Sequence, residues 1–219
     1  MEPPPSQENG DQPIVFIVDD DASMRRALTN LFESVGLKVE TFGSAPQLLQ
    51  AKPPQVPSCL VLDIRLPGAS GLDLQSDLAK ANIQTPIIFI TGHADVPMTV
   101  RAMKGGAIDF LTKPVRDQDI LDAVQAAIER DRKRRDLNKT VSNVRSRFES
   151  LSSRERDVLA LVTSGLMNKQ VAAQLGLAEI TVKIYRGQIM RKMGAKSLAD
   201  LVRMSEALGI RPSRSDVQT

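Results

Sequence analysis

Short apolar runs alternate with amphipathic stretches over roughly the first 130 residues. Three runs are continuously apolar, at 14–18, 59–62 and 87–90, which is typical of strands buried on both faces of a sheet. Weaker strand candidates lie at 37–42 and 107–111. The helical periodicity predicts helices over about 22–35, 44–51, 71–81, 96–104 and from 117 onward. This alternation predicts an α/β fold, a doubly wound five-stranded parallel sheet with helices on both faces, over residues 13–130.

From Asp119 the helical pattern continues to about Ser150. Its apolar positions follow a 3-4 spacing that predicts one seam along a long helix: Ile120, Ala123, Ala127, Leu137, Val141, Val144, Phe148 and Leu151. Arg130 and Arg134 occupy the missing seam positions, inside a basic run over 130–135. Two interpretations of residues 131–150 stay open, a solvated helix that spaces two domains and a helix that pairs with a second copy of itself.

The segment 151–210 contains four helical stretches separated by Gly165, Gly176 and Gly194. The middle pair is short and is joined by a tight turn at Leu175-Gly176-Leu177. This pattern predicts an all-α, four-helix domain with a helix-turn-helix at its centre. The polar, proline-rich residues 1–12 predict a disordered leader, and 211–219 predict a disordered tail.

Charge is divided unequally along the chain. Residues 1–118 have 10 basic and 14 acidic side chains, a net of −4, whereas 119–150 have a net of +2 and 151–219 a net of +5. An acidic first half and a basic second half suggest two domains, with polyanion binding in the second. Aromatic residues make up only 3% and tryptophan is missing, so the stacking surfaces that bind single strands are scarce, and duplex DNA is the favoured partner.

Composition excludes several other classes. One cysteine, Cys59, and one histidine, His93, rule out a disulfide framework, a zinc finger and a Cys–His nucleophile pair. No run approaches the ~20 apolar residues of a membrane span, and the N-terminus lacks the pattern of a signal peptide, so a cytoplasmic protein without a membrane partner is expected. Cys59 is assigned to core packing and His93 to a loop.

Polar side chains follow the predicted strands at their carboxyl ends. Asp19-Asp20-Asp21 follow the first, Asp63 ends the third, Thr91 ends the fourth, and Lys113 follows the fifth. In a parallel sheet these ends meet at one edge, so three acids, a hydroxyl and an ammonium converge there. Crowded carboxylates favour a hard divalent cation, Mg²⁺, and the remaining lysine and hydroxyl could hold the oxygens of a phosphoryl group. Asp21 is assigned to capping the following helix.

This arrangement resembles the receiver domain of two-component response regulators. The resemblance rests on Asp19-Asp20, on Asp63 with Leu66-Pro67-Gly68 and Gly71 behind it, on Thr91, and on Lys113-Pro114. It implies Asp63 as phosphoacceptor and Mg²⁺ held by Asp20, Asp63, the backbone carbonyl of Arg65 and, through water, Asp19. It further implies that Lys113 bridges to the phosphoryl group before a cis bond to Pro114, that Thr91 bonds a phosphoryl oxygen, and that the Phe110 rotamer follows Thr91.

A second family shares part of this pattern. The apolar run followed by Asp19-x-Asp21-x-Ser23 resembles the opening motif of haloacid-dehalogenase-type phosphatases, with Asp19 as nucleophile and Thr91 and Lys113 in later roles. That family needs a further acidic pair after an apolar strand, whereas Asp117, Asp119 and Asp122 lie in a helical stretch. A third alternative is a DNA-binding adaptor that is never phosphorylated and whose acids form a structural cation site.

The basic segment resembles the LuxR-type helix-turn-helix. The resemblance rests on 151–159, Gly165, 168–172 and 181–183. Together with the receiver, it identifies the chain as similar to the NarL/FixJ group of transcriptional regulators and to its FixJ-like branch, which has residues such as 91–98 and 102–104.

The helix predicted over about 179–193 is the candidate recognition helix. Val182, Tyr185, Ile189 and Met193 share an inward face, which leaves a basic outward face that can enter a major groove. The resemblance implies Lys183, Ile184 and Gly187 as base-facing residues. Phosphate contacts are expected from Asn168, Lys169, Arg186, Arg191 and Lys192. Ala178 replaces the usual capping serine, so this helix is expected to fray or to be capped from elsewhere.

The sequence therefore predicts a phosphorylation-controlled transcriptional regulator rather than an enzyme. A sensor histidine kinase would supply the phosphoryl group, and the phosphorylated receiver would dimerise through a face built from about 96–104, 107–111 and 117–130. Two recognition helices would then bind pseudo-palindromic promoter DNA, with RNA polymerase as a further candidate partner.

Overall fold

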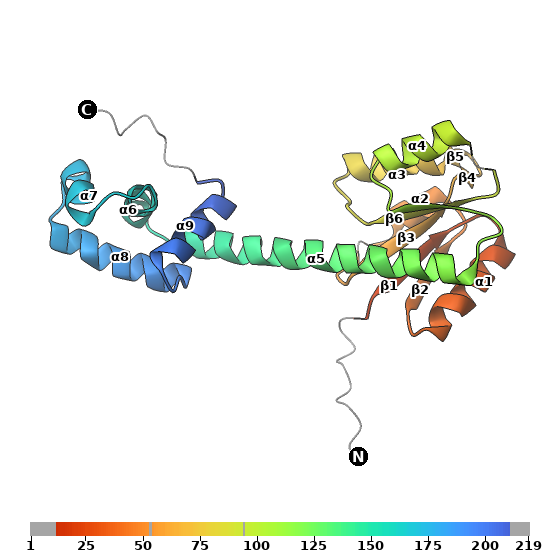
Figure 1. Cartoon of the computed structure of the whole chain (residues 1–219), viewed down its shortest axis with the longest axis horizontal. Coiled ribbons are helices and arrows are strands. Elements are labelled where there is room, and N and C mark those ends of the chain that lie inside the picture. The colour runs from red at the N-terminus through yellow and green to blue at the C-terminus, as the bar shows by residue number, and fades with distance from the viewer. Residues whose placement is uncertain (1–11, 53, 94, 211–219) are drawn as a thin grey trace, which may run out of the picture. The chain divides into compact units, whose positions relative to one another are not determined.

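The computed structural model describes residues 12–52, 54–93 and 95–210 (Figure 1). It divides into two compact units at Arg135/Asp136. The disordered leader and tail expected at 1–12 and 211–219 lie outside the described residues, apart from Gln12. Among the residues that the structure describes, none of the helices has the length and apolar character that a membrane crossing requires.

The first unit is built on a five-stranded parallel sheet in the order β2-β1-β3-β6-β7. Its strands are β1 (Ile14–Val18), β2 (Lys38–Phe42), β3 (Ser58–Asp63), β6 (Ile87–Thr91) and β7 (Asp109–Thr112). The short strands β4 (Arg65–Leu66) and β5 (Ala69–Ser70) form a separate antiparallel pair. The doubly wound sheet is confirmed. The two-residue strands β4 and β5 were not expected, and β7 begins two residues later than the pattern predicts.

Alternate strand residues supply two cores, one on each face of the sheet. Helices cover both faces (Figure 1). Phe16, Leu60 and Phe89 pack against α2 (Ala45–Gln50), α3 (Gly71–Lys80) and α4 (Val96–Lys104). Ile17, Val61 and Ile88 pack against α1 (Ala22–Ser34) and the first half of α5 (Asp117–Glu149). All six residues of β3 are buried, including Cys59, and burial raises the pKa of its thiol. The assignment of Cys59 to the core is confirmed.

The second unit is helical. It contains the end of α5, α6 (Ser153–Thr163), α7 (Asn168–Leu175), α8 (Glu179–Met193) and α9 (Leu198–Ala207). Its core joins Val158, Val171, Val182 and Ile189 with Val144 of α5. Gly176 and Gly194 end α7 and α8 in left-handed conformations, which glycine adopts without steric cost.

The single seam expected along α5 is corrected by the structure. Ile120, Ala123 and Ala127 pack on the sheet, and Val144 lies in the helical unit's core. Leu137, between these two sets, is 68% exposed. The 3-4 spacing continues because both ends of the helix need an apolar face, but each end uses its face against a different core.

Candidate functional site

The carboxyl ends of three strands bring one cation and two acids together. Asp19 follows β1, Asp63 ends β3, and Lys113 follows β7. The ammonium of Lys113 donates to Asp19 Oδ2 at 2.7 Å and to Asp63 Oδ2 at 2.6 Å. Asp19 is fully buried and Asp63 almost so. These three side chains therefore lie in contact at the edge of the sheet where the sequence predicts them to converge.

Lys113 remains charged in this environment. Burial alone would lower its pKa, but the hydrogen bonds and the negative charges of Asp19 and Asp63 outweigh burial, and the pKa lies above its usual value. The peptide bond from Lys113 to Pro114 is cis, as the family resemblance implied. One positive charge thus neutralises part of a cluster of three acids.

Asp20 completes the acidic cluster. One carboxylate oxygen each of Asp19, Asp20 and Asp63 lies within 4.8 Å of the others. Asp19 Oδ1 accepts from the Asp21 amide at 2.8 Å, and Asp63 Oδ1 accepts from the Arg65 amide at 2.9 Å. Lys113 compensates one of the three negative charges. The remaining negative charge and the oxygen donors of the three carboxylates fit a hard divalent cation such as Mg²⁺.

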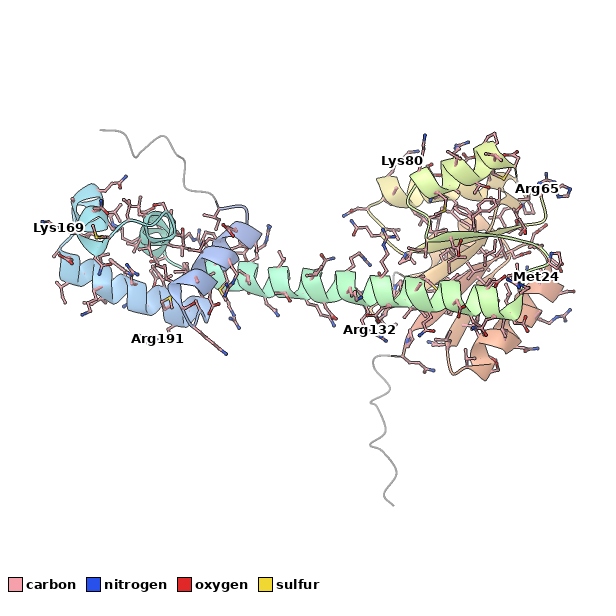
Figure 2. The ribbon with its side chains drawn as sticks, viewed as in Figure 1. Met24, Arg65, Lys80, Arg132, Lys169 and Arg191 are labelled. Atoms are coloured by element: carbon pink, nitrogen blue, oxygen red, sulfur yellow. The ribbon has the colours of Figure 1, made fainter. Side chains whose placement is uncertain are left out.

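The loop after β3 approaches its own strand closely. A Cβ on Gly71 would lie 2.5 Å from the carbonyl oxygen of Asp63, so only glycine fits there. The Gly71 amide also donates to the Ile64 carbonyl at 2.8 Å. The side chain of Arg65 is exposed at this end of the unit (Figure 2). The structure thus explains the glycine of the motif by the packing of the loop that supports Asp63.

Thr91 and Phe110 lie on the neighbouring strands β6 and β7. The buried Thr91 hydroxyl donates to the His93 carbonyl at 3.1 Å and accepts from its amide at 3.3 Å. Phe110 is half-buried, with its ring centroid 6.4 Å from that of Phe89. His93 is exposed in the following loop, as expected, and its backbone is the present partner of the Thr91 hydroxyl.

In the helical unit, α8 presents the predicted outward face. Val182, Ile189 and Met193 are buried, and Tyr185 packs against the same core. The opposite face is exposed and consists of Lys183, Ile184, Gly187 and Arg191. Figure 2 shows Arg191 on α8 and Lys169 on α7, both exposed.

Two of the predicted phosphate-binding residues already bond within the unit. Arg186 Nη1 donates to Asn168 Oδ1 at 2.7 Å and joins α8 to the start of α7. Lys192 Nζ donates at 2.7 Å to Glu155, whose carboxylate is buried and also accepts from the Ser152 amide. Neither contact was predicted from the sequence. The pattern Ser152-x-x-Glu155 before an apolar run indicates a capping box, but it does not reveal Lys192 as a partner.

The two units each match a known family. The model of the response regulator receiver domain matches residues 15–125, and that of bacterial regulatory proteins of the luxR family matches residues 149–205. The chain belongs to the response regulator family. It is a two-component response regulator with a LuxR-type DNA-binding domain and an acidic pocket, not a conventional enzyme. The dehalogenase-type alternative is therefore set aside.

Several known proteins are similar to most of the chain. Nodulation protein W of Bradyrhizobium diazoefficiens is 68% identical over 203 residues, which cover 93% of this chain and 89% of the relative. FixJ of Azorhizobium caulinodans is 43% identical over 91% of this chain and 94% of its own, which confirms the expected FixJ-like branch. The solved structure of the response regulator StyR matches with a TM-score of 0.82 at 49% identity, over 89% of this chain and 98% of that one.

Proposed function

We propose that Asp63 accepts a phosphoryl group from a sensor histidine kinase. A carboxylate oxygen of Asp63 forms a bond to phosphorus while the bond from phosphorus to the donor histidine nitrogen breaks, which gives an acyl phosphate. The observation that supports this assignment is the contact of Lys113 with both Asp63 and Asp19, because an ammonium there can bind the transferred oxygens.

The acidic cluster would hold Mg²⁺. Its proposed ligands are Asp20, Asp63 and the backbone carbonyl of Arg65, with Asp19 through water. The ion would supply positive charge against the incoming phosphoryl oxygens. Asp19 also orients Lys113, since it accepts one of the three bonds that the ammonium can donate.

Phosphorylation would rearrange the neighbouring strands. We propose that the Thr91 hydroxyl exchanges its His93 partners for a phosphoryl oxygen and that Phe110 turns inward into the space left. The exposed apolar side chains of α4 support an interface that this change would alter: Val96 is 76% exposed, Val100 44% and Met103 43%. Two receivers would then pair through α4, β7 and the first half of α5. A nearly complete switch requires about 5.5 kcal/mol of differential stabilisation.

The output is sequence-specific binding of promoter DNA. Lys183, Ile184 and Gly187 would face base edges, and Lys169 and Arg191 would contact phosphates. Arg186 and Lys192 would contact phosphates only in addition to their bonds with Asn168 and Glu155, while Asn168 would position Arg186. Because the proposed partners are a kinase, DNA and RNA polymerase, we place the protein in the cytoplasm.

Incubation of the full chain with labelled acetyl phosphate and Mg²⁺ tests the phosphoacceptor. The wild type and Asp73→Asn, a matched change at an exposed acid on α3, should incorporate label, and Asp63→Asn should not. Equal labelling of Asp63→Asn would place the acceptor elsewhere. Absence of label from the wild type would favour the adaptor that is never phosphorylated.

Selection of DNA from a random pool, with and without acetyl phosphate, tests the output. Phosphorylated protein should enrich a pseudo-palindromic sequence, and Lys183→Ala should weaken binding to it by about 1–3 kcal/mol. Lys80→Ala, the same substitution on α3 of the receiver (Figure 2), should bind as the wild type does. A Lys183→Ala protein with unchanged affinity would contradict the assignment of the recognition face.

A further inference from the structure

Asp131 is a buried acid inside the basic run of α5. Its side chain has no exposed surface. The carboxylate accepts from the Ser58 backbone amide at 3.0 Å, from Arg134 Nε at 3.0 Å and from Arg135 Nε at 2.6 Å. A buried carboxylate is stable only when hydrogen bonds compensate for its lost hydration. The Asp131 cluster is therefore a buried hydrogen-bond network rather than an exposed surface ion pair.

The cluster lies at the edge of the sheet opposite the acidic site. Ser58 begins β3, and Asp63 ends the same strand. Arg134 also donates to Gln84 Oε1, in the segment before β6, at 3.2 Å. Ile128 is the last residue of α5 that packs in the sheet's core. The receiver therefore holds α5 through polar bonds for nearly two further turns after its apolar contacts end.

These bonds also account for the basic run. Arg134 and Arg135 pair with Asp131, and Arg132 and Lys133 lie 3.1 and 3.7 Å from Glu129. Arg132 is labelled on α5 in Figure 2. Four of the basic side chains over 130–135 thus have acidic partners one turn earlier. The basic run therefore stabilises α5 and its attachment to the receiver, and its charges are not primarily available to DNA.

The next two turns of α5 have little support of their own. Residues 136–143 are exposed except for the half-buried Val141. Six of them have low intrinsic helix propensity: Asp136, Asn138, Thr140, Val141, Ser142 and Asn143. Packing resumes at Val144, and Arg147 Nη1 donates to the Met193 carbonyl at 2.9 Å. An isolated helix this short is unstable in water, so its helicity depends on what holds its two ends.

We propose that the Asp131 cluster is the receiver-side anchor that keeps residues 136–143 helical. The cluster fixes the turn before this segment to β3, and the contacts of Val144 and Arg147 fix the turn after it. Loss of the receiver-side anchor leaves the weak segment attached at one end only, and it then opens locally without unfolding of either core.

Hydrogen exchange of the full-length protein tests this anchor. Asp131→Asn keeps the side-chain shape but offers fewer acceptor sites to Ser58, Arg134 and Arg135, and we expect amides 136–143 to exchange at least about tenfold faster. The matched control is Asp136→Asn, the same substitution at an exposed acid five residues later, which should exchange as the wild type does.

A second pair of variants keeps the test decisive if Asp131→Asn loosens the whole receiver. The double variant Arg134→Gln, Arg135→Gln keeps the Asp131–Ser58 bond but removes the Arg134–Gln84 bond to the receiver and both arginine bonds of Asp131. This weakens the anchor on the side of residues 136–143, whose exchange should accelerate with β3 still protected. Added helix propensity through Asn138→Ala, Ser142→Ala and Asn143→Ala should restore protection in either background. Wild-type exchange rates over 136–143 in the arginine double variant would overturn the proposal, as would a failure of the alanine substitutions to restore protection.

Discussion

Lys113 holds two buried acids with one ammonium, and Asp20 adds a third acid that is exposed. The bonds that Asp19 and Asp63 accept from backbone amides hold both carboxylates in place. The three acids therefore stay close together and repel one another. A divalent cation bound at the proposed site should relieve this repulsion and thereby stabilise the folded receiver.

We therefore expect Mg²⁺ to raise the midpoint of thermal unfolding of the receiver by several degrees. Binding at a hundred times the dissociation constant contributes about 2.7 kcal/mol to the folded state. Asp20→Asn should reduce this shift strongly, whereas Asp73→Asn should retain it. Calorimetry with MgCl₂ and with EDTA measures the difference, and equal shifts in the two variants would argue against a site at the acidic cluster.

Glu155 should make the helical unit sensitive to acid. Burial would raise its pKa, but bonds from Lys192 and Ser152 outweigh burial, and the pKa in the folded state lies below its usual value of 4.5. Its stabilising contribution is therefore present above about pH 4.5 and is lost as the pH falls through the lower folded value. Glu155→Gln should lower the free energy of unfolding at pH 7 by about 1–3 kcal/mol and remove this acid dependence.

Tyrosine fluorescence during urea unfolding can measure this effect in the full chain. Tyr185 is the only tyrosine, there is no tryptophan, and Tyr185 packs in the core of the helical unit. Asp157→Asn is a suitable control, because Asp157 lies on the exposed side of α6, the helix that contains Glu155. An identical pH dependence in Glu155→Gln and the wild type would show that the ion pair has no role in acid stability.

At the scale of elements, α8 begins without a side-chain cap. Ala178 has the extended backbone of an N-cap residue, with φ −74° and ψ 145°, but its side chain offers no acceptor to the amides of the first turn. The helix begins at Glu179, directly after this residue. Packing of Val182 and Ile189 in the core stabilises the helix in place of the cap.

Ala178→Ser should stabilise the helical unit by about 1 kcal/mol, because the serine hydroxyl could accept an amide hydrogen bond in the first turn. Ala173→Ser, at an exposed interior position of α7, tests for a general effect of serine and should be neutral or slightly destabilising. Both values can be obtained from urea unfolding followed by Tyr185 fluorescence. A destabilised Ala178→Ser protein would indicate that the extended N-cap conformation changes when the hydroxyl is added.

Sequence patterns predicted most elements and the edge at which the site forms. Continuous apolar runs such as 14–18 and 87–90 have few interpretations other than buried strands, and parallel strands bring Asp19, Asp63 and Lys113 to one edge. The β4–β5 pair was missed because two residues show no periodicity. The bonds Asp131–Ser58 and Glu155–Lys192 were missed because they join residues 73 and 37 positions apart, and only tertiary folding brings these together.

At the scale of the whole molecule, the receiver and the DNA-binding unit differ in net charge. The segment 151–219 has a net charge of +5, and 1–118 has a net of −4, so the basic unit attracts DNA while the receiver does not. The α8 face has two exposed cations, Lys183 and Arg191, and Lys169 adds a third from α7. DNA binding should therefore depend strongly on salt.

The logarithm of the DNA association constant should fall linearly with the logarithm of salt concentration. Lys169→Ala should weaken binding to all sequences alike and make this slope shallower by about 1, because one phosphate contact is lost. Titrations by fluorescence anisotropy at several salt concentrations measure the slope. Lys80→Ala provides the charge-matched control, and an unchanged slope in Lys169→Ala would remove this lysine from the phosphate contacts.

The burial of Cys59 has a practical consequence. Its thiol lies inside β3, and its raised pKa leaves almost no reactive thiolate at neutral pH. Maleimide dyes and thiol-reactive spin labels should consequently not react with the native protein and should modify only a cysteine introduced at the surface. Probes can then be attached to either unit without first replacing the natural cysteine, which makes distance measurements between the units directly accessible.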